Sequence, residues 1–215
     1  MNLEQYNSLV FDCDGVVLNS NKVKTRAFYE AALPYGEASA KALVDHHVVN
    51  GGVSRYRKFA YFLSQIVSRD AAGPGLDELL EVYARKVREG LMTCEADPAL
   101  LALRERTPSR PWFIVSGGDQ AELREVFSAR GLDYLFDGGI FGSPDSKDEI
   151  LVRELESGKM LMPGLFLGDS RYDHQASVNA GLDFVFIKQW TEFHDWESYC
   201  KNHRIEFAAS LRDLI

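Results

Sequence analysis

Apolar residues recur at helical spacing through most of the first half of the chain. A short apolar run at residues 8–11 comes first and predicts a buried strand. From about Asn21 to about Arg106, apolar positions then repeat every three or four residues, as at Val23 and Ala27. Glycine, proline and asparagine interrupt this pattern at three places, which are residues 34–36, 50–52 and 73–75. We therefore expect an all-helical block made of several helices.

The pattern changes after residue 106, where short apolar runs alternate with amphipathic segments. The runs predict strands at residues 112–115, 140–141, 165–167 and 184–187. The segments between them predict helices that end at Gly131, cover residues 147–155, and end just before Gly181, while residues 190–215 add a helix and a small edge element. Asp119 and Glu122 resemble a capping box at the start of the first of these helices. Such alternation predicts an α/β fold, in which helices cover both faces of a parallel sheet.

The composition is that of a globular protein. With 215 residues, of which 46% are hydrophobic, the chain can bury a sizeable core. No apolar run approaches the ~18 residues of a membrane span, and the opening residues MNLEQYN lack the basic and apolar segments of a signal peptide. Three widely spaced cysteines suit a reducing compartment better than a disulfide framework or a zinc site. We expect a soluble, cytoplasmic protein that has no membrane partner.

The charge is negative overall and unevenly distributed. A formal net charge of −8 argues against nucleic acid as a partner. Residues 19–93 carry 11 lysines and arginines against 8 acidic residues, whereas the rest of the chain carries 13 against 24. The predicted helical block is therefore the basic part of the molecule.

Polar residues follow three of the predicted strands at the point where each strand ends. Asp12 and Asp14 follow the first strand, Ser116 follows the second, and Asp169 lies just after the fourth. Asp173 lies about one helical turn beyond Asp169. In open parallel sheets, ligands bind beyond the carboxyl ends of the strands. We therefore expect these side chains to converge on one crevice.

This set of side chains suits the binding of a metal ion and a phosphate group. Carboxylates held close together repel unless a cation neutralises them, and a hard divalent ion such as Mg²⁺ takes oxygen ligands. Asp12, Asp14 and Asp169 are therefore candidate metal ligands. Ser116 with Gly117 offers a hydroxyl and backbone N–H groups near a helix N-terminus, where phosphate oxygens bind well.

Lys147 adds a positive charge that can compensate a phosphoryl group. Taken one at a time, each of these residues also has an ordinary structural role. Paired acids are common in solvated turns, serine and glycine cap helices, a lysine at a helix start is usually solvated, and Asp169 with Asp173 can complement a helix dipole. Their joint order along the chain is far more specific than any single member.

Four motifs in this order resemble those of the haloacid dehalogenase-like superfamily of phosphohydrolases, and in particular its branch of phosphoglycolate phosphatases and β-phosphoglucomutase-like proteins. They are FDCDGVV, IVSGG, SPDSKDE and LGDSRYD, and the resemblance covers residues 9–181. It implies a Rossmann-like, doubly wound parallel-sheet core formed by residues 1–18 and 107–215. The helical block, residues 19–106, then corresponds to the small α-helical cap domain that is inserted in this family.

The resemblance also implies a role for each site residue. Asp12 is then the nucleophile that forms an aspartyl-phosphate, and Asp14 is the acid and base, with its backbone carbonyl on Mg²⁺. Asp169 binds the metal ion, and Asp173 supports the site. The residues that hold the transferring phosphoryl oxygens are Ser116, Gly117 and Lys147.

A loop of the helical block supplies one further candidate. Residues 52–55, with the sequence GVSR, resemble a cap loop in which an arginine meets an anionic substrate. Arg55 is then a substrate-binding residue, in keeping with the basic character of the block. The alternative is that Arg55, Arg57 and Lys58 form the solvated face of a helix.

The resemblance predicts an Mg²⁺-dependent phosphatase that acts on a small phosphorylated metabolite. An acid at position 14 favours phosphate esters, because the dehalogenase and phosphonatase branches of the family lack it. Three alternatives are open: a sugar-phosphate mutase on the same scaffold, a non-enzymatic phosphoacceptor of the receiver type, and a catalytically silent binding module. The motif LGDSRYD is closer to the phosphatases, since the mutases usually carry an acid before the aspartate. The inserted helical block is unlike a receiver.

Overall fold

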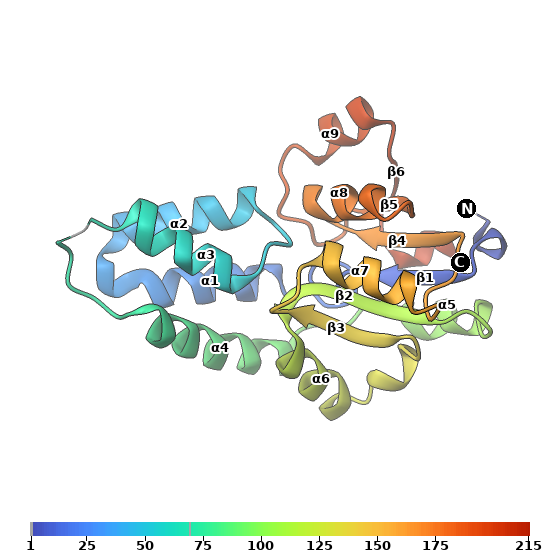
Figure 1. Cartoon of the computed structure of the whole chain (residues 1–215), viewed down its shortest axis with the longest axis horizontal. Helices are drawn as coiled ribbons and strands as arrows, with labels where there is room; N and C mark the ends of the chain where they lie inside the picture. Colours follow the sequence, from blue (N-terminus) through green and yellow to red (C-terminus); the bar gives the residue numbers. More distant parts are fainter. Residues whose placement is uncertain (1, 69) are drawn as a thin grey trace.

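The computed structural model of the chain describes residues 2–68 and 70–215; residues 1 and 69, which fall in the predicted core and cap, lie outside the described residues. The described residues form an α/β core and a helical cap that projects from it (Figure 1). The core contains a six-stranded parallel sheet, with strand order β3-β2-β1-β4-β5-β6. Its strands are β1 (Ser8–Phe11), β2 (Trp112–Asp119), β3 (Gly139–Ser143), β4 (Gly164–Gly168), β5 (Asp183–Ile187) and β6 (Glu206–Ala208).

Helices cover both faces of this sheet. Val10 and Phe166 lie in the apolar cluster that includes α7 (Lys147–Glu156) and α8 (Arg171–Asn179). Their strand neighbours Leu9, Phe11, Leu165 and Leu167 lie in a second cluster with α5 (Leu100–Arg106) and α6 (Gln120–Ala129). Because the central strands are buried on both faces, they read as continuous apolar runs instead of alternating ones. The predicted α/β fold with a parallel sheet is confirmed.

The tail adds the helix and the edge element that the sequence predicts. Helix α9 (Trp196–His203) lies beside β5, where Trp196 stacks on Phe186 with ring centroids 5.8 Å apart, and β6 pairs with β5 at the sheet edge. Among the described helices, none is both long enough and apolar enough to cross a membrane. The cytoplasmic location stays a prediction.

The cap is a bundle of short helices around an aromatic centre. Phe28, Phe59 and Tyr83 come from three different helices, and the Phe28 ring lies 5.0 Å from the Phe59 ring and 4.3 Å from the Tyr83 ring. The predicted breaks at 34–36, 50–52 and 73–75 all fall between α-helices, the first of them at the 3-10 turn η2. The cap elements are α1 (Asn21–Ala32), η2 (Leu33–Tyr35), α2 (Glu37–Val49), α3 (Arg55–Tyr61), the π-helical turn η3 (Phe62–Ile66) and α4 (Leu76–Thr93).

One helix lies elsewhere than the sequence predicts. The sequence predicts a cap that ends at residue 106, but α5 lies with the core (Figure 1), where it contacts the 3-10 turn η5 (Leu211–Leu214) and buries Leu100 and Leu103. A helix with one apolar face has the same sequence pattern whether that face covers a sheet or another helix. The pattern alone therefore does not divide cap from core at this point.

The start of α6 also departs from its predicted form. The Asp119 carboxylate accepts a hydrogen bond from the Glu122 backbone N–H at 3.0 Å, so the predicted N-cap residue is confirmed. The Glu122 carboxylate does not complete a capping box, because it binds the Arg55 guanidinium of the cap. A residue that the local pattern assigns to a helix cap thus joins two parts of the molecule.

Candidate active site

The predicted site residues meet at the carboxyl-terminal edge of the sheet. Strand β1 lies between β2 and β4, so Asp12, which follows β1, lies between Ser116 in the second half of β2 and Asp169, which follows β4. Lys147 is the first residue of α7, and Asp173 lies in the first turn of α8. All five side chains are buried. The order of the strands therefore brings together residues that lie far apart in the sequence.

Asp12 is tied to a backbone amide and to a lysine. Its Oδ1 accepts a hydrogen bond from the Cys13 N–H at 2.8 Å and lies 2.8 Å from Lys147 Nζ. Lys147 also donates to Asp173, so one buried lysine bridges two carboxylates. Burial and the Asp173 charge raise the pKa of Asp12 to about 7, although Lys147 acts in the opposite direction. A nucleophilic carboxylate at this place needs more positive charge than Lys147 alone supplies.

Asp169 and Asp173 complete an acidic cluster with Asp12. One carboxylate oxygen of each residue lies within 4.8 Å of the others. Burial, and then the charges of Asp12 and Asp173, raise the pKa of Asp169 well above its ordinary value. Asn21 Nδ2 steadies Asp169 through a hydrogen bond of 2.7 Å to Oδ2. Asp173 Oδ2 accepts from the backbone N–H of Ser170 at 3.0 Å and from its hydroxyl at 2.7 Å.

The donor set of this cluster fits a hard divalent cation. Carboxylates that raise each other's pKa are stabilised in their ionised form when a cation lies between them. Asp173 is already engaged by Lys147, by Ser170 and by the Asp169 backbone N–H, so it holds the site in shape. Asp12 and Asp169 are therefore the carboxylates best placed to hold Mg²⁺.

Asp14 belongs to a separate pair. Its Oδ1 accepts a hydrogen bond of 2.5 Å from Ser20, and its Oδ2 accepts one from Lys24. Burial disfavours the ionised form, but Lys24 and Ser20 outweigh it and lower the pKa of Asp14. Because this carboxylate is committed to Lys24, only the backbone carbonyl of Asp14 is left for a metal ion.

Lys24 and Asn21 are residues of the site that the sequence motifs do not identify. Both lie in the first two turns of α1, which begins just after the first motif. Ser20, Lys24 and Phe28 follow one another at helical spacing, and all three are buried. That spacing places the three residues on one face of a helix, and it is the sequence pattern from which the burial of Lys24 could have been predicted.

Two glycines leave room for the site. Gly15 has a φ of +79°, and a Cβ on it would lie 2.6 Å from Asp169 Cγ and overlap the Asp169 carboxylate. A Cβ on Gly117 would lie 3.0 Å from the carbonyl carbon of Gly52 in the cap and overlap its oxygen. The first glycine lets two acidic motifs approach each other, and the second lets a cap loop lie directly on the core.

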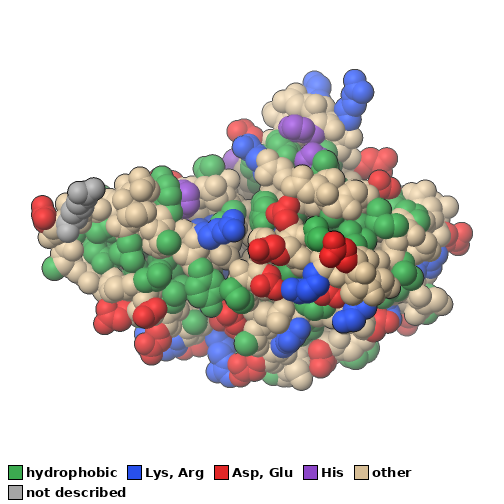
Figure 2. Space-filling model, viewed as in Figure 1, with side chains coloured by type: hydrophobic (Ala, Val, Ile, Leu, Met, Phe, Trp, Pro, Cys, Tyr) green, Lys and Arg blue, Asp and Glu red, His purple; other side chains and the backbone are tan. Residues whose placement is uncertain are grey.

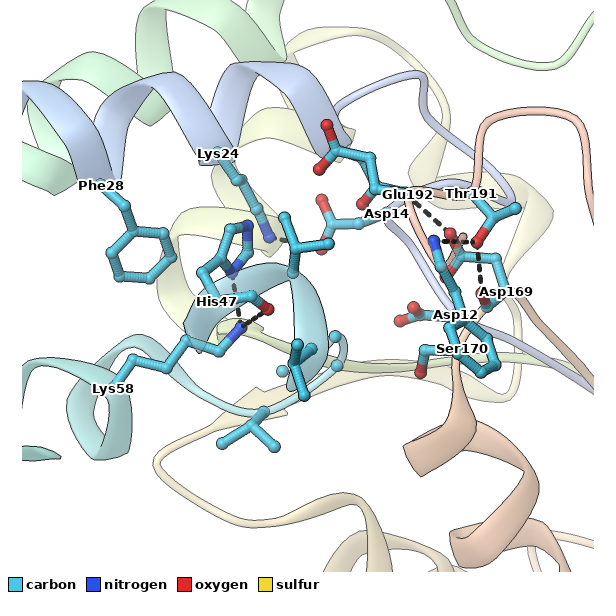
Figure 3. Close-up of a pocket in the computed structure, with 18 of the residues that line it drawn as sticks. Asp12, Asp14, Lys24, Phe28, His47, Lys58, Asp169, Ser170, Thr191 and Glu192 are labelled. Atoms are coloured by element: carbon cyan, nitrogen blue, oxygen red, sulfur yellow. Dashed lines mark hydrogen bonds and ion pairs between the residues drawn. The ribbon is translucent and has the colours of Figure 1, made fainter. Parts of the chain in front are cut away.

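A cavity lies between the cap and the core. Asp12, Asp14 and Asp169 line its core side, while His47 and Lys58 line its cap side (Figure 3). Figure 2 shows acidic and basic side chains gathered near the junction of the two parts on the face in view. The predicted crevice thus exists, and the basic cap closes over it.

Arg55 is buried and bonded to the core. Its Nη1 and Nη2 donate to the two carboxylate oxygens of Glu122 at 3.1 and 2.5 Å, and its guanidinium lies 4.7 Å from the centre of the Tyr83 ring. The solvated-face alternative is therefore wrong for Arg55 and for Lys58, which are 5% and 2% exposed, and it holds for Arg57. Arg55 also lines the cavity, where it could meet a substrate. Its contact with substrate stays a prediction.

Comparison with known proteins agrees with this geometry. The family model for haloacid dehalogenase-like hydrolases matches residues 6–181. No curated protein matches the sequence.

Solved structures of the same fold come from several organisms. A protein of Clostridium acetobutylicum described as a predicted phosphatase has a TM-score of 0.74 at 15% identity, over 97% of this chain and 96% of that one. A protein of Lactobacillus plantarum classed provisionally as a phosphoglycolate phosphatase has a TM-score of 0.73 at 20% identity, over 98% of both chains. CbbY of Rhodobacter sphaeroides, solved with phosphate, has a TM-score of 0.63 at 19% identity, over 85% of this chain and 86% of that one. At these identities the likeness is one of fold.

Proposed function

This chain belongs to the haloacid dehalogenase-like hydrolase family, and we propose that it is an Mg²⁺-dependent phosphatase of small phosphorylated metabolites. The observation that carries the proposal is the buried cluster in which Asp12, Asp169 and Lys147 meet at the end of β1. Carboxylates beside a buried lysine and glycine-rich backbone suit a phosphoryl group together with its metal ion. Structural neighbours that are described as phosphatases have the same fold.

Asp12 is the nucleophile in this proposal. One of its carboxylate oxygens attacks the phosphorus atom, the bond from phosphorus to the leaving oxygen breaks, and an aspartyl-phosphate forms. Ser116, the Gly117 backbone and Lys147 hold the phosphoryl oxygens. Asp12, Asp169 and the Asp14 backbone carbonyl would hold Mg²⁺, which would supply positive charge to offset both the carboxylates and the phosphate.

Asp14 is the general acid and the general base in this proposal. In the first step it gives a proton to the leaving alcohol, and in the second it takes one from the water that attacks the aspartyl-phosphate and releases inorganic phosphate. Lys24 lowers the pKa of Asp14, which suits the second step. The first step then requires Lys24 to leave Asp14 or to pass a proton to it. Lys24 therefore positions Asp14 as the base of the second step, and its movement or its proton governs the first.

Gly168 favours a phosphatase over a mutase. A Cβ on Gly168 would lie 2.8 Å from Asp173 Cγ, so this packing has no room for the acid that mutases of the family usually carry before the metal-binding aspartate. The inserted cap argues against the receiver alternative. Both points support hydrolysis as the reaction.

Turnover of p-nitrophenyl phosphate by the purified protein tests the proposal. We expect multiple turnovers that stop when EDTA removes Mg²⁺, and a phosphorylated protein after rapid acid quench that is missing in Asp12→Asn. Labelling of one equivalent without turnover would favour a receiver, and bisphosphate-dependent isomerisation of a sugar phosphate would favour a mutase. Metal-independent hydrolysis would overturn the proposed site.

A further inference from the structure

Lys58 is a buried lysine on the cap side of the cavity. It lies in α3 and is 2% exposed. Its Nζ lies 2.7 Å from His47 Nδ1 and 3.5 Å from the His47 carbonyl oxygen, and the Phe28 ring centre is 5.5 Å away. Figure 3 shows Lys58 and His47 across the cavity from Asp12 and Asp169. The amine therefore faces the space that a bound substrate would occupy.

Lys58 differs from its cationic neighbours because it has no acidic partner. Lys24 pairs with Asp14, and Arg55 pairs with Glu122. Among residues 2–68 and 70–215, no carboxylate oxygen lies within 4.0 Å of Lys58 Nζ. Buried charges in proteins are normally paired, since an unpaired one loses its hydration without compensation.

His47 does not supply the missing charge. Burial, followed by the charge of Lys58, holds the pKa of His47 well below its ordinary range, which favours the neutral imidazole. In the tautomer that carries its proton on Nε2, Nδ1 accepts from the lysine. Burial and the nearby Lys24 lower the pKa of Lys58 to about 7. A lysine has three N–H donors, and His47 takes only those that point to its Nδ1 and its carbonyl. At least one donor is left for the cavity.

We propose that Lys58, steadied by His47, binds a second anionic group, a carboxylate or a phosphate, at the far end of the phosphorylated substrate. This inference rests on the proposed function, because the first phosphate must lie at Asp12. It names the substrate class as phosphomonoesters that carry another negative charge. Arg55 is not the main binding partner of that second anionic group, since Nη1 and Nη2 of its guanidinium both donate hydrogen bonds to Glu122.

A series of alkyl monophosphates of two to five carbons, ending in a hydroxyl, a carboxylate or a second phosphate, tests the proposal. We expect one chain length at which an anionic end raises kcat/KM by about 10- to 150-fold over the hydroxyl end, the range of one charge-assisted hydrogen bond. Comparison of the esters that end in a carboxylate with those that end in a phosphate shows which of the two anionic groups the site prefers. In Lys58→Met this ratio should fall to near one, and Lys58→Arg should keep part of it.

Lys41→Met is the matched control. Lys41 is a cap lysine whose side chain is 66% exposed and pairs only with Glu37 among the described residues, so its loss should leave both the rate and the ratio unchanged. Thermal unfolding of each variant is measured in parallel. Absence of the preference in the wild-type protein would overturn the inference even where a variant folds poorly.

Two results would overturn the inference. They are the absence of any preference for anionic ends in the wild-type protein and a preference that persists in Lys58→Met. Failure to hydrolyse every ester, p-nitrophenyl phosphate included, would instead overturn the proposed function, and the inference with it. The two failures are therefore distinguishable.

Discussion

Replacing Gly15 with alanine adds a single methyl group next to the candidate metal ligand. The new Cβ would lie 2.6 Å from Asp169 Cγ and 2.5 Å from Asn21 Nδ2, which are both closer than van der Waals contact. The backbone at Gly15 also has a φ of +79°, a conformation that alanine adopts only with strain. The substitution therefore combines backbone strain with displacement of the Asp169 carboxylate.

The two effects have separate magnitudes. A left-handed conformation costs alanine about 1–2 kcal/mol. Overpacking of a buried site by one methyl group costs about 1–3 kcal/mol more. For a chain of this size 1 kcal/mol lowers Tm by about 2–4 °C, so Gly15→Ala should lower it by roughly 4–20 °C. Displacement of a group that holds a metal ion typically weakens metal binding by about 10- to 100-fold.

Gly158→Ala separates strain from crowding. Gly158 has a φ of +72°, and a Cβ on it would meet nothing within 4 Å. In this variant only the backbone strain should act, and it should lower Tm by roughly 2–8 °C. It should keep the wild-type Mg²⁺ requirement, because it lies outside the site.

Thermal unfolding without metal and a titration of the rate against Mg²⁺ measure the two effects. We expect Gly15→Ala to unfold at a lower temperature than Gly158→Ala and to need more Mg²⁺ for half-maximal hydrolysis of p-nitrophenyl phosphate. Equal losses of Tm in the two variants, together with an unchanged Mg²⁺ requirement in Gly15→Ala, would refute the reasoning.

Three further changes target the charged groups of the site. Asp14→Asn keeps the backbone carbonyl but removes the acid and base, so turnover should fall by about 10²- to 10⁴-fold and labelled phosphoenzyme should accumulate under rapid quench; full activity would contradict this role. Arg55→Ala leaves the Glu122 carboxylate buried without its cation, which should destabilise the closed cap by up to about 3–5 kcal/mol and lower kcat/KM for small and large esters alike. A loss confined to large substrates would return Arg55 to substrate binding. Burial lowers the pKa of Lys58 from 10.5 to about 7, so the unfolded chain binds more protons between these values. The free energy of unfolding of the wild type, minus that of Lys58→Met, should therefore rise by a few kcal/mol from pH 7 to 10.5, since each pKa unit is worth ~1.4 kcal/mol; a flat difference would be inconsistent with a depressed pKa.

The core of the site could be predicted because its residues lie at strand ends. Asp12, Ser116 and Asp169 each follow an apolar run, and in a parallel sheet those ends meet on one edge. A local pattern therefore carries three-dimensional information in this case. The breaks between the cap helices could also be predicted from a local pattern, because glycine and proline act on the conformation of the backbone next to them.

The cap side of the site could not be predicted in this way. Lys58 and Arg55 look like residues of a solvated helix face, since charged side chains are mostly exposed. Their burial depends on how α3 packs against α2, α4 and the core, and Arg55 meets Glu122 across 67 positions of sequence. Contacts of that kind follow from the docking of two separate parts, which leaves no periodic signal.

The contact between Gly52 and Gly117 links the choice of substrate to the chemistry. Gly117 follows Ser116 at the edge of the sheet where we propose that the phosphate binds, and Gly52 begins the loop that leads to Arg55 and Lys58. With this loop on the core, the unpaired charge of Lys58 is shut in the same cavity as the carboxylates. A substrate with a second anion neutralises that charge and so stabilises the closed cap, whereas an uncharged end leaves it uncompensated and favours opening. On the proposal made above, the interaction that selects the substrate therefore also closes the cap for transfer of the phosphoryl group to Asp12, and departure of the dephosphorylated product lets the cap open to the water that hydrolyses the aspartyl-phosphate.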